Sequence, residues 1–210
     1  MDIVCLDLEG VLVPEIWVAV AERTGIEALK ATTRDVPDYD VLMRQRLRLL
    51  DEHGLTIGQI QSVIDGLTPL LGAKDFCDWV RARYQLVILS DTFYEFAQPL
   101  MRQLDWPTLF CHRLDVGDTG KITGYRLRMP DHKRSAVAAF KKLNFTVLAA
   151  GDSYNDVSML SEADAGFFFR APDKVTKEFP KFPKNETYDE LREAIRASSH
   201  RLAVRDPQTS

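Results

Sequence analysis

The sequence has few cysteines and no long apolar run. Its 210 residues include three cysteines, Cys5, Cys77 and Cys111, and their odd number and wide spacing fit neither a disulfide framework nor a metal motif. We therefore expect reduced, mostly buried thiols. The apolar N-terminal stretch is interrupted by Asp7 and Glu9, unlike a signal peptide, and no run approaches a membrane span. The sequence thus predicts a cytoplasmic protein without membrane contact.

An excess of positive charge is also missing. The chain carries 27 Lys and Arg against 31 Asp and Glu, a net charge of −4. A nucleic-acid binder would need a basic face, so no nucleic-acid partner is expected. A small anionic substrate remains compatible, because one pocket needs only a few cations. GxGxxG, P-loop and HExxH motifs are absent as well, which leaves those chemistries unsupported.

Short apolar runs alternate with helical patterns along most of the chain. The runs rich in branched or aromatic residues cover 3–8, 85–89, 145–150 and 165–169. The helical patterns cover about 72–84, 92–104, 133–143, 154–162 and 187–199. Strands that alternate with helices indicate an α/β fold with a doubly wound parallel sheet.

Two segments depart from this alternation. Residues 14–71 separate the first two strands by far more than one crossover helix needs, and they are interpreted as an inserted helical cap. The catalytic core domain would then comprise 1–13 and 72–210, a size that suits one domain with an insertion. Residues 113–128 predict a small β-hairpin, and the polar end of the chain, about 203–210, predicts a frayed tail.

Acidic and hydroxyl side chains follow three of the four predicted strands. They are Asp7 and Glu9, Ser90 and Asp91, and Asp152, with Asp156 one helical turn further on. Ligands of open α/β sheets bind at the carboxyl ends of strands. Gathered carboxylates repel one another, and a Mg²⁺ ion with oxygen ligands relieves that repulsion. We predict Asp7, Asp152 and the backbone carbonyl of Glu9 as direct ligands, with Asp156 bound through water or orienting the site.

Each of these residues also has a simpler interpretation. Asp152 and Asp156 could cap the helix that begins near residue 154, and Ser90 could cap the end of a strand. Asp7 is harder to explain in this way, because an acid at the end of an apolar strand is costly unless something pairs with it. Their joint occurrence at successive strand ends favours a functional site.

These segments resemble a known family. DLEGV at 7–11, VILS at 87–90, Lys133 and GDSYND at 151–156 are similar, in order, to the four motifs of the haloacid dehalogenase superfamily. The helical cap between the first two resembles the phosphoserine phosphatase branch. Glu9 replaces the usual second Asp, which supports a resemblance to members that also transfer the phosphoryl group to homoserine.

The resemblance implies a role for each motif residue. Asp7 would attack phosphorus and form a phospho-aspartyl intermediate, and Glu9 would exchange the proton with the leaving and incoming oxygen. Mg²⁺ would be the cofactor. The phosphoryl group and the rest of the substrate would be bound by Ser90, Asp91, Lys133 and Asn155. For Lys133 the alternative is a solvated surface lysine, but cations crowd a predicted helix start there, which favours a nearby anion.

Two residues of the predicted cap would bind an amino-acid head group. Helical periodicity places Arg46 within an apolar stripe formed by Tyr39, Leu42, Met43, Leu47 and Leu50. A buried guanidinium needs an anion, either a substrate carboxylate or an acid of the cap. Glu15, after Pro14, suits a helix start, and the resemblance implies that it binds the substrate ammonium.

Several functions remain open at this point. Hydrolysis of phosphoserine and transfer to homoserine would use the same residues, because both amino acids share one head group. Another small phosphomonoester is a further option. A non-catalytic, receiver-like module is disfavoured by the Asp7/Glu9 pair and by the long cap. A homodimer is left open.

Overall fold

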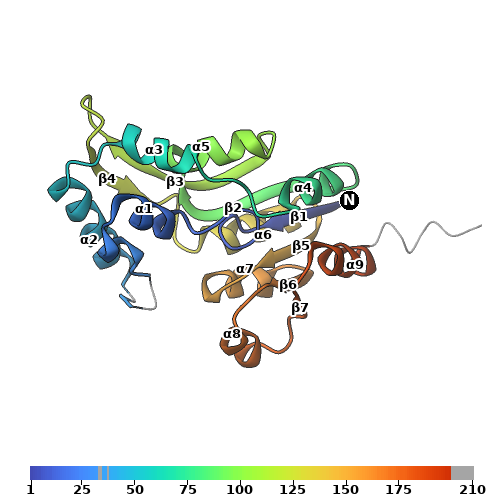
Figure 1. Cartoon of the computed structure of the whole chain (residues 1–210). Coiled ribbons are helices and arrows are strands. Elements are labelled where there is room, and N and C mark those ends of the chain that lie inside the picture. Colours follow the sequence, from blue (N-terminus) through green and yellow to red (C-terminus); the bar gives the residue numbers. More distant parts are fainter. Residues whose placement is uncertain (33–34, 37, 200–210) are drawn as a thin grey trace, which may run out of the picture.

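The computed structural model contains a seven-stranded sheet with helices on both faces (Figure 1). It describes residues 1–32, 35–36 and 38–199. The strands are β1 (Asp2–Leu6), β2 (Gln85–Phe93), β3 (Thr108–Val116), β4 (Ile122–Arg126), β5 (Thr146–Gly151), β6 (Ala165–Phe169) and β7 (Lys184–Asn185). Their order is β4-β3-β2-β1-β5-β6-β7, and only the β3–β4 pair is antiparallel. The predicted α/β fold with a doubly wound parallel sheet is therefore confirmed.

Strand β1 lies in the middle of the sheet and is buried on both faces. Val4 and Leu6 join one apolar core, whereas Ile3 and Cys5 join the other, as the alternation of strand side chains requires. The helices outside the segment 14–71 are α4 (Ala73–Arg81), α5 (Tyr94–Gln103), α6 (His132–Lys142), η2 (Tyr154–Asp156), α7 (Val157–Glu162), α8 (Asp173–Glu178) and α9 (Tyr188–Ser198). Helices α4, α5 and α9 pack on the first face and α6, α7 and α8 on the second.

The segment between β1 and α4 is helical, as expected. It contains α1 (Ile16–Thr24), η1 (Glu27–Lys30), α2 (Tyr39–Glu52) and α3 (Ile57–Asp65), near β3 and β4 (Figure 1). The backbone N–H of Ile57 donates to the Gly120 carbonyl at 2.8 Å, which ties the segment to the hairpin turn. The division into a core of 1–13 and 72–210 and a cap of 14–71 stays a prediction.

Four elements differ from the sequence prediction. Strand β2 continues past Leu89 to Phe93, with a register shift against β3 between those residues. Strand β3 begins at Thr108 and pairs in parallel with β2 before it forms the expected hairpin with β4. The predicted hairpin is thus an extension of the main sheet. Helix α8 and strand β7 were not predicted, and the expected frayed tail lies outside the described residues.

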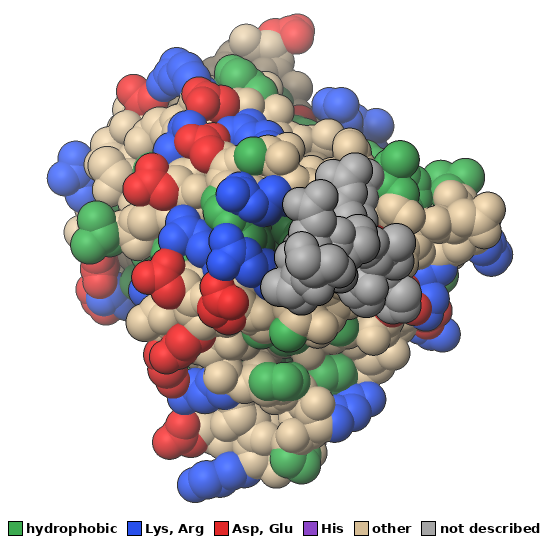
Figure 2. Space-filling model, turned by 90° about the vertical axis from the view of Figure 1, so that its right-hand side faces the viewer, with side chains coloured by type: hydrophobic (Ala, Val, Ile, Leu, Met, Phe, Trp, Pro, Cys, Tyr) green, Lys and Arg blue, Asp and Glu red, His purple; other side chains and the backbone are tan. Residues whose placement is uncertain are grey.

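The surface and the cysteines agree with the composition. The three cysteines are free and buried. None of the helices in the described ranges is long and apolar enough to cross a membrane. On the face seen in Figure 2, basic side chains lie among acidic ones, so the coloured part of this face offers no purely basic surface to a nucleic-acid backbone.

Candidate active site

Three neighbouring parallel strands bring acidic side chains to one edge of the sheet. Strand β1 is flanked by β2 and β5, so the ends that carry Asp7, Asp91 and Asp152 meet. Carboxylate oxygens of Asp7, Asp152 and Asp156 lie within 4.8 Å of one another. The structure therefore gathers the acids that the motif spacing predicted.

Two glycines make this close approach possible. Gly10 has a φ of 76°, and a Cβ there would lie 2.4 Å from Oδ2 of Asp152, so a side chain would collide with the carboxylate. A Cβ at Gly151 would lie 2.3 Å from Cγ of Asp156. The Gly-Asp pair at 151–152 is thus explained by the way in which Asp156 folds back over the end of β5.

Lys133 occupies the centre of the acidic cluster. It is 2% exposed, and its Nζ lies 3.0 Å from Asp7 Oδ1, 3.2 Å from Asp91 Oδ2 and 2.8 Å from Asp156 Oδ1. The surface-lysine alternative is therefore wrong. As the second residue of α6, Lys133 places its charge at an unfavourable helix end, and the carboxylates compensate for that cost.

Asp156 is engaged through both of its oxygens. Oδ1 pairs with Lys133, while Oδ2 accepts the backbone N–H groups of Asp152 at 3.0 Å and Ser153 at 3.1 Å. The helix-cap interpretation of Asp156 is thus correct, and the same residue also contacts the site lysine. Its two oxygens fix both Lys133 and the loop that carries Asp152.

The electrostatics of the cluster favour a bound cation. Burial, followed by the charge of Asp156, raises the pKa of Asp152 to about 7. Burial and Asp156 likewise raise the pKa of Asp7 well above its usual value, and Lys133 only partly offsets this. Three carboxylates beside one ammonium form a set of hard oxygen donors, so the residues present fit a divalent ion such as Mg²⁺.

Glu9 and Glu15 lie side by side next to this cluster. Oε2 of Glu9 accepts the backbone N–H of Ile16 at 2.9 Å, at the start of α1, and exposed Glu15 is the residue before that helix. Burial and the neighbouring charge of Glu15 raise the pKa of Glu9 to about 8. The raised pKa favours the protonated form of Glu9, the state that a proton donor needs.

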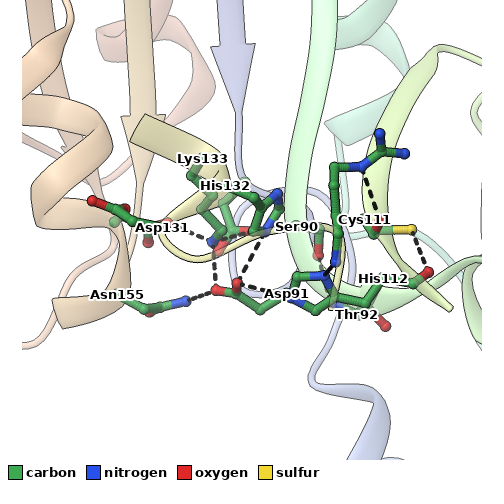
Figure 3. Close-up of polar contacts among 12 residues, drawn as sticks. Ser90, Asp91, Thr92, Cys111, His112, Asp131, His132, Lys133 and Asn155 are labelled. Carbon is green, nitrogen blue, oxygen red and sulfur yellow. Dashed lines mark hydrogen bonds and ion pairs between the residues drawn. The ribbon is translucent and has the colours of Figure 1, made fainter. Parts of the chain in front are cut away.

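Asp91 collects nitrogen donors from three elements (Figure 3). Its Oδ2 receives Nδ2 of Asn155 at 2.7 Å and Lys133, and its Oδ1 lies 3.1 Å from Nε2 of His132 and 3.6 Å from Nε2 of His112. Partial burial works to raise the pKa of Asp91, but Lys133 and the other donors hold it well below the usual range. Sequence reasoning missed both histidines, and only the position of His132 next to Lys133 signalled one of them.

Ser90 is also buried at this edge, within the irregular part of β2. It is 1% exposed, and its Oγ accepts the backbone N–H of Thr92 at 3.3 Å. Irregular strand segments commonly redirect side chains next to active sites. Because β2 continues to Phe93, Ser90 does not cap the end of that strand, as the simpler interpretation had it. Its Oγ accepts one hydrogen bond, which leaves the hydroxyl proton available for another acceptor.

Arg46 is buried, as its place in the apolar stripe predicted. Its guanidinium carbon lies 4.5 Å from the centre of the Trp17 ring, and Nη2 donates to the Ala31 carbonyl at 2.8 Å. Nη1 faces only the Met43 sulfur at 3.8 Å, and Nε lacks a hydrogen-bond partner among the described residues. No acid of the described ranges forms an ion pair with Arg46, so the structure does not support an internal salt bridge.

A family model of haloacid dehalogenase-like hydrolases matches residues 1–164. The chain belongs to this family. It is 64% identical over 205 residues to "Phosphoserine phosphatase ThrH" of Pseudomonas aeruginosa, covering 97% of this chain and 100% of that relative. It is 63% identical to a phosphoserine phosphatase of Pseudomonas syringae, covering 97% and 86%.

Solved structures show the same fold. An apo phosphoserine phosphatase matches with a TM-score of 0.75 at 24% identity, covering 93% of this chain and 98% of that one. A "Phospho-Aspartyl Intermediate Analogue of Phosphoserine phosphatase" matches with a TM-score of 0.75 over 93% of this chain and 98% of the other. These likenesses confirm the fold that the four motifs implied.

Proposed function

We propose that this family member is a Mg²⁺-dependent phosphoserine phosphatase that acts through a phospho-Asp7 intermediate. The observation that carries the proposal is the buried Asp7 carboxylate 3.0 Å from Lys133, within 4.8 Å of the Asp152 and Asp156 oxygens. The relatives named phosphoserine phosphatase cover almost the whole chain and support the choice of substrate.

The reaction would proceed in two steps, transfer of the phosphoryl group to Asp7 and hydrolysis of the intermediate. Asp7 attacks phosphorus while the bond to the serine oxygen breaks, and the proton of Glu9 passes to that oxygen. Glu9, now a carboxylate, then takes a proton from water as the water oxygen displaces Asp7 and releases phosphate. Lys133 and Ser90 would stabilise the charge on the transferring oxygens.

The metal would be held by Asp7, Asp152 and the backbone carbonyl of Glu9. When bound, Mg²⁺ supplies positive charge to the phosphoryl oxygens and relieves repulsion among the carboxylates. Asp156 would act as an orienting residue, because both of its oxygens already have protein partners. These site assignments, including substrate contacts by Asp91 and Asn155, belong to the proposal.

The substrate head group would lie between α1 and α2 of the 14–71 segment. Arg46 has unused donor capacity, and a carboxylate is the anion that a guanidinium binds with two contacts. Glu15 lies close enough to raise the pKa of Glu9, and it would bind the ammonium. Another phosphomonoester or a non-catalytic module would leave these two residues without a role.

Transfer to homoserine is the second candidate. The replacement of an expected Asp by Glu9 supports it, because this motif resembles that of family members that also transfer the phosphoryl group to homoserine. Incubation with phosphoserine labelled in its phosphoryl group, with and without homoserine, separates the two reactions. Labelled phosphate alone supports hydrolysis, and label in homoserine supports transfer. Absence of both products with Mg²⁺ present would refute the proposed function. A homodimer and a cytoplasmic location remain predictions.

A further inference from the structure

Two buried histidines lie behind Asp91 and have no part in the mechanism above. His132, the first residue of α6, is 3% exposed, and His112 on β3 is 4% exposed. Their ring centres are 4.5 Å apart, and both Nε2 atoms face the same oxygen of Asp91 (Figure 3). Buried polar rings that converge on a site carboxylate call for a chemical explanation.

A transition-metal site at Asp91, His112 and His132 is the first explanation to consider, since their ligand atoms lie within 4.8 Å of one another. The hydrogen bond at the far side of His112 argues against it. The backbone N–H of Arg128 donates to Nδ1 of His112 at 3.1 Å, so a neutral His112 carries its proton on Nε2. A protonated Nε2 cannot bind a metal, but it can donate toward Asp91.

The same reasoning assigns the proton of His132. Ionised Asp91 only accepts hydrogen bonds, so the 3.1 Å contact requires a proton on Nε2 of His132. Its Nδ1 is buried without a partner in the part of the chain that the structure describes. The ring is therefore placed for the contact with Asp91, at the cost of one unsatisfied nitrogen.

The two carboxylate oxygens of Asp91 have different partners. Oδ1 faces the histidines, whereas Oδ2 binds Lys133 and Asn155. Asp91 itself lies where the β2–β3 register shifts, so its orientation depends strongly on these side-chain contacts. If the contact to Oδ1 were lost, the carboxylate could rotate, which would weaken its ion pair with Lys133 and its hydrogen bond from Asn155.

We propose that His132, packed against His112, is a positioning residue that fixes the Asp91 carboxylate and thereby orients Lys133 and Asn155 for phosphoryl transfer. This inference rests on the proposed function, in which Lys133 stabilises the transferring group. Because the effect concerns the phosphoryl end of the substrate, it applies equally to phosphoserine and to an aryl phosphate.

The first test replaces His132 by Leu, which removes the donor, and by Gln, whose amide can restore a donor. One hydrogen bond to a charged group predicts that kcat falls by about 10- to 100-fold in H132L, on both substrates. KM should change by less than about threefold, and H132Q should recover most of the loss. A matched control is H53Q, because His53 is exposed at the end of α2; this variant should retain the wild-type kcat.

A double-mutant cycle with D91N shows whether His132 acts through Asp91. The loss caused by H132L should nearly vanish in the D91N background. Wild-type kcat in H132L, equal loss in H132L and H132Q, or an undiminished loss in D91N would each overturn the inference.

A second measurement uses the unmodified protein and stays decisive if H132L does not fold. ¹⁵N NMR of the imidazoles should show protonated Nε2 atoms on both histidines and an unprotonated Nδ1 on His112. An unprotonated Nε2 on His132 would refute the contact. If wild type releases no phosphate from phosphoserine, the proposed function fails, whereas wild-type activity with an unprotonated His132 Nε2 contradicts only this inference.

Discussion

The replacement of Arg46 by Ala tests whether this residue recognises the carboxylate of the substrate head group. Arg46 is 7% exposed and stacks on Trp17, yet its only strong protein acceptor in the described ranges is the Ala31 carbonyl. We infer that its remaining donors bind the substrate carboxylate. The variant should therefore discriminate between a substrate that carries this carboxylate and one that lacks it.

The expected magnitude follows from two charge-assisted hydrogen bonds. Together they stabilise by about 3–5 kcal/mol, and about 1.4 kcal/mol corresponds to a tenfold change in rate. R46A should therefore lower kcat/KM for phosphoserine by about 150- to 5000-fold. An aryl phosphate, which has no carboxylate, should lose less than about threefold.

The assay compares phosphate release from both substrates with Mg²⁺ at several concentrations. R46K keeps the charge but loses the planar fork, so it should lie between wild type and R46A. Arg44 on the same helix is exposed and pairs with Asp40; R44A is thus a matched control with wild-type kinetics expected. An equal loss on both substrates in R46A would refute head-group recognition by Arg46.

Three further predictions concern the acidic cluster. G10A should abolish activity and destabilise the fold by more than about 1–2 kcal/mol, because its Cβ would lie 2.4 Å from Asp152 Oδ2. The control is G54A: Gly54 has a similar positive φ, but a Cβ there would meet no atom within 4 Å, so this variant should stay active. In chelator, the melting temperature should fall as pH rises from about 4 to about 7 and then level off, because burial raises the folded pKa of Asp152 to about 7 while the unfolded pKa is about 4, so its ionisation opposes folding. Mg²⁺ should reduce this dependence, and a pH-independent melting curve in chelator would contradict it. E9Q keeps the shape but not the exchangeable proton, so it should lower kcat for phosphoserine by about 100-fold or more, while circular dichroism stays unchanged; near-normal turnover would remove Glu9 from the mechanism.

The sequence predicted the acidic edge because its geometry follows from strand order. Asp7 and Asp152 each follow an apolar run, and parallel neighbours bring their carboxyl ends together. The burial of Lys133 was also predictable, because a cation at a helix start needs a nearby anion. These inferences depend on local pattern and on one general property of parallel sheets.

The contacts of Asp91 were not predictable in the same way. His112 reaches Asp91 only because β3 pairs in parallel with β2 from Thr108 onward, whereas the sequence pattern indicated a hairpin alone. Arg46 was placed on the correct buried face of α2, but its stacking on Trp17 depends on how two helices pack. Long-range packing of this kind leaves little trace in a single sequence.

The central claim is that Asp7 carries the phosphoryl group covalently. The most direct measurement is mass spectrometry of the protein quenched in acid within its first turnovers on phosphoserine and Mg²⁺. The account predicts one added phosphoryl group on the peptide that contains Asp7, and none in D7N, which should keep its fold but release no phosphate. Rapid product formation by D7N, or a phosphoryl group on another residue, would contradict the account.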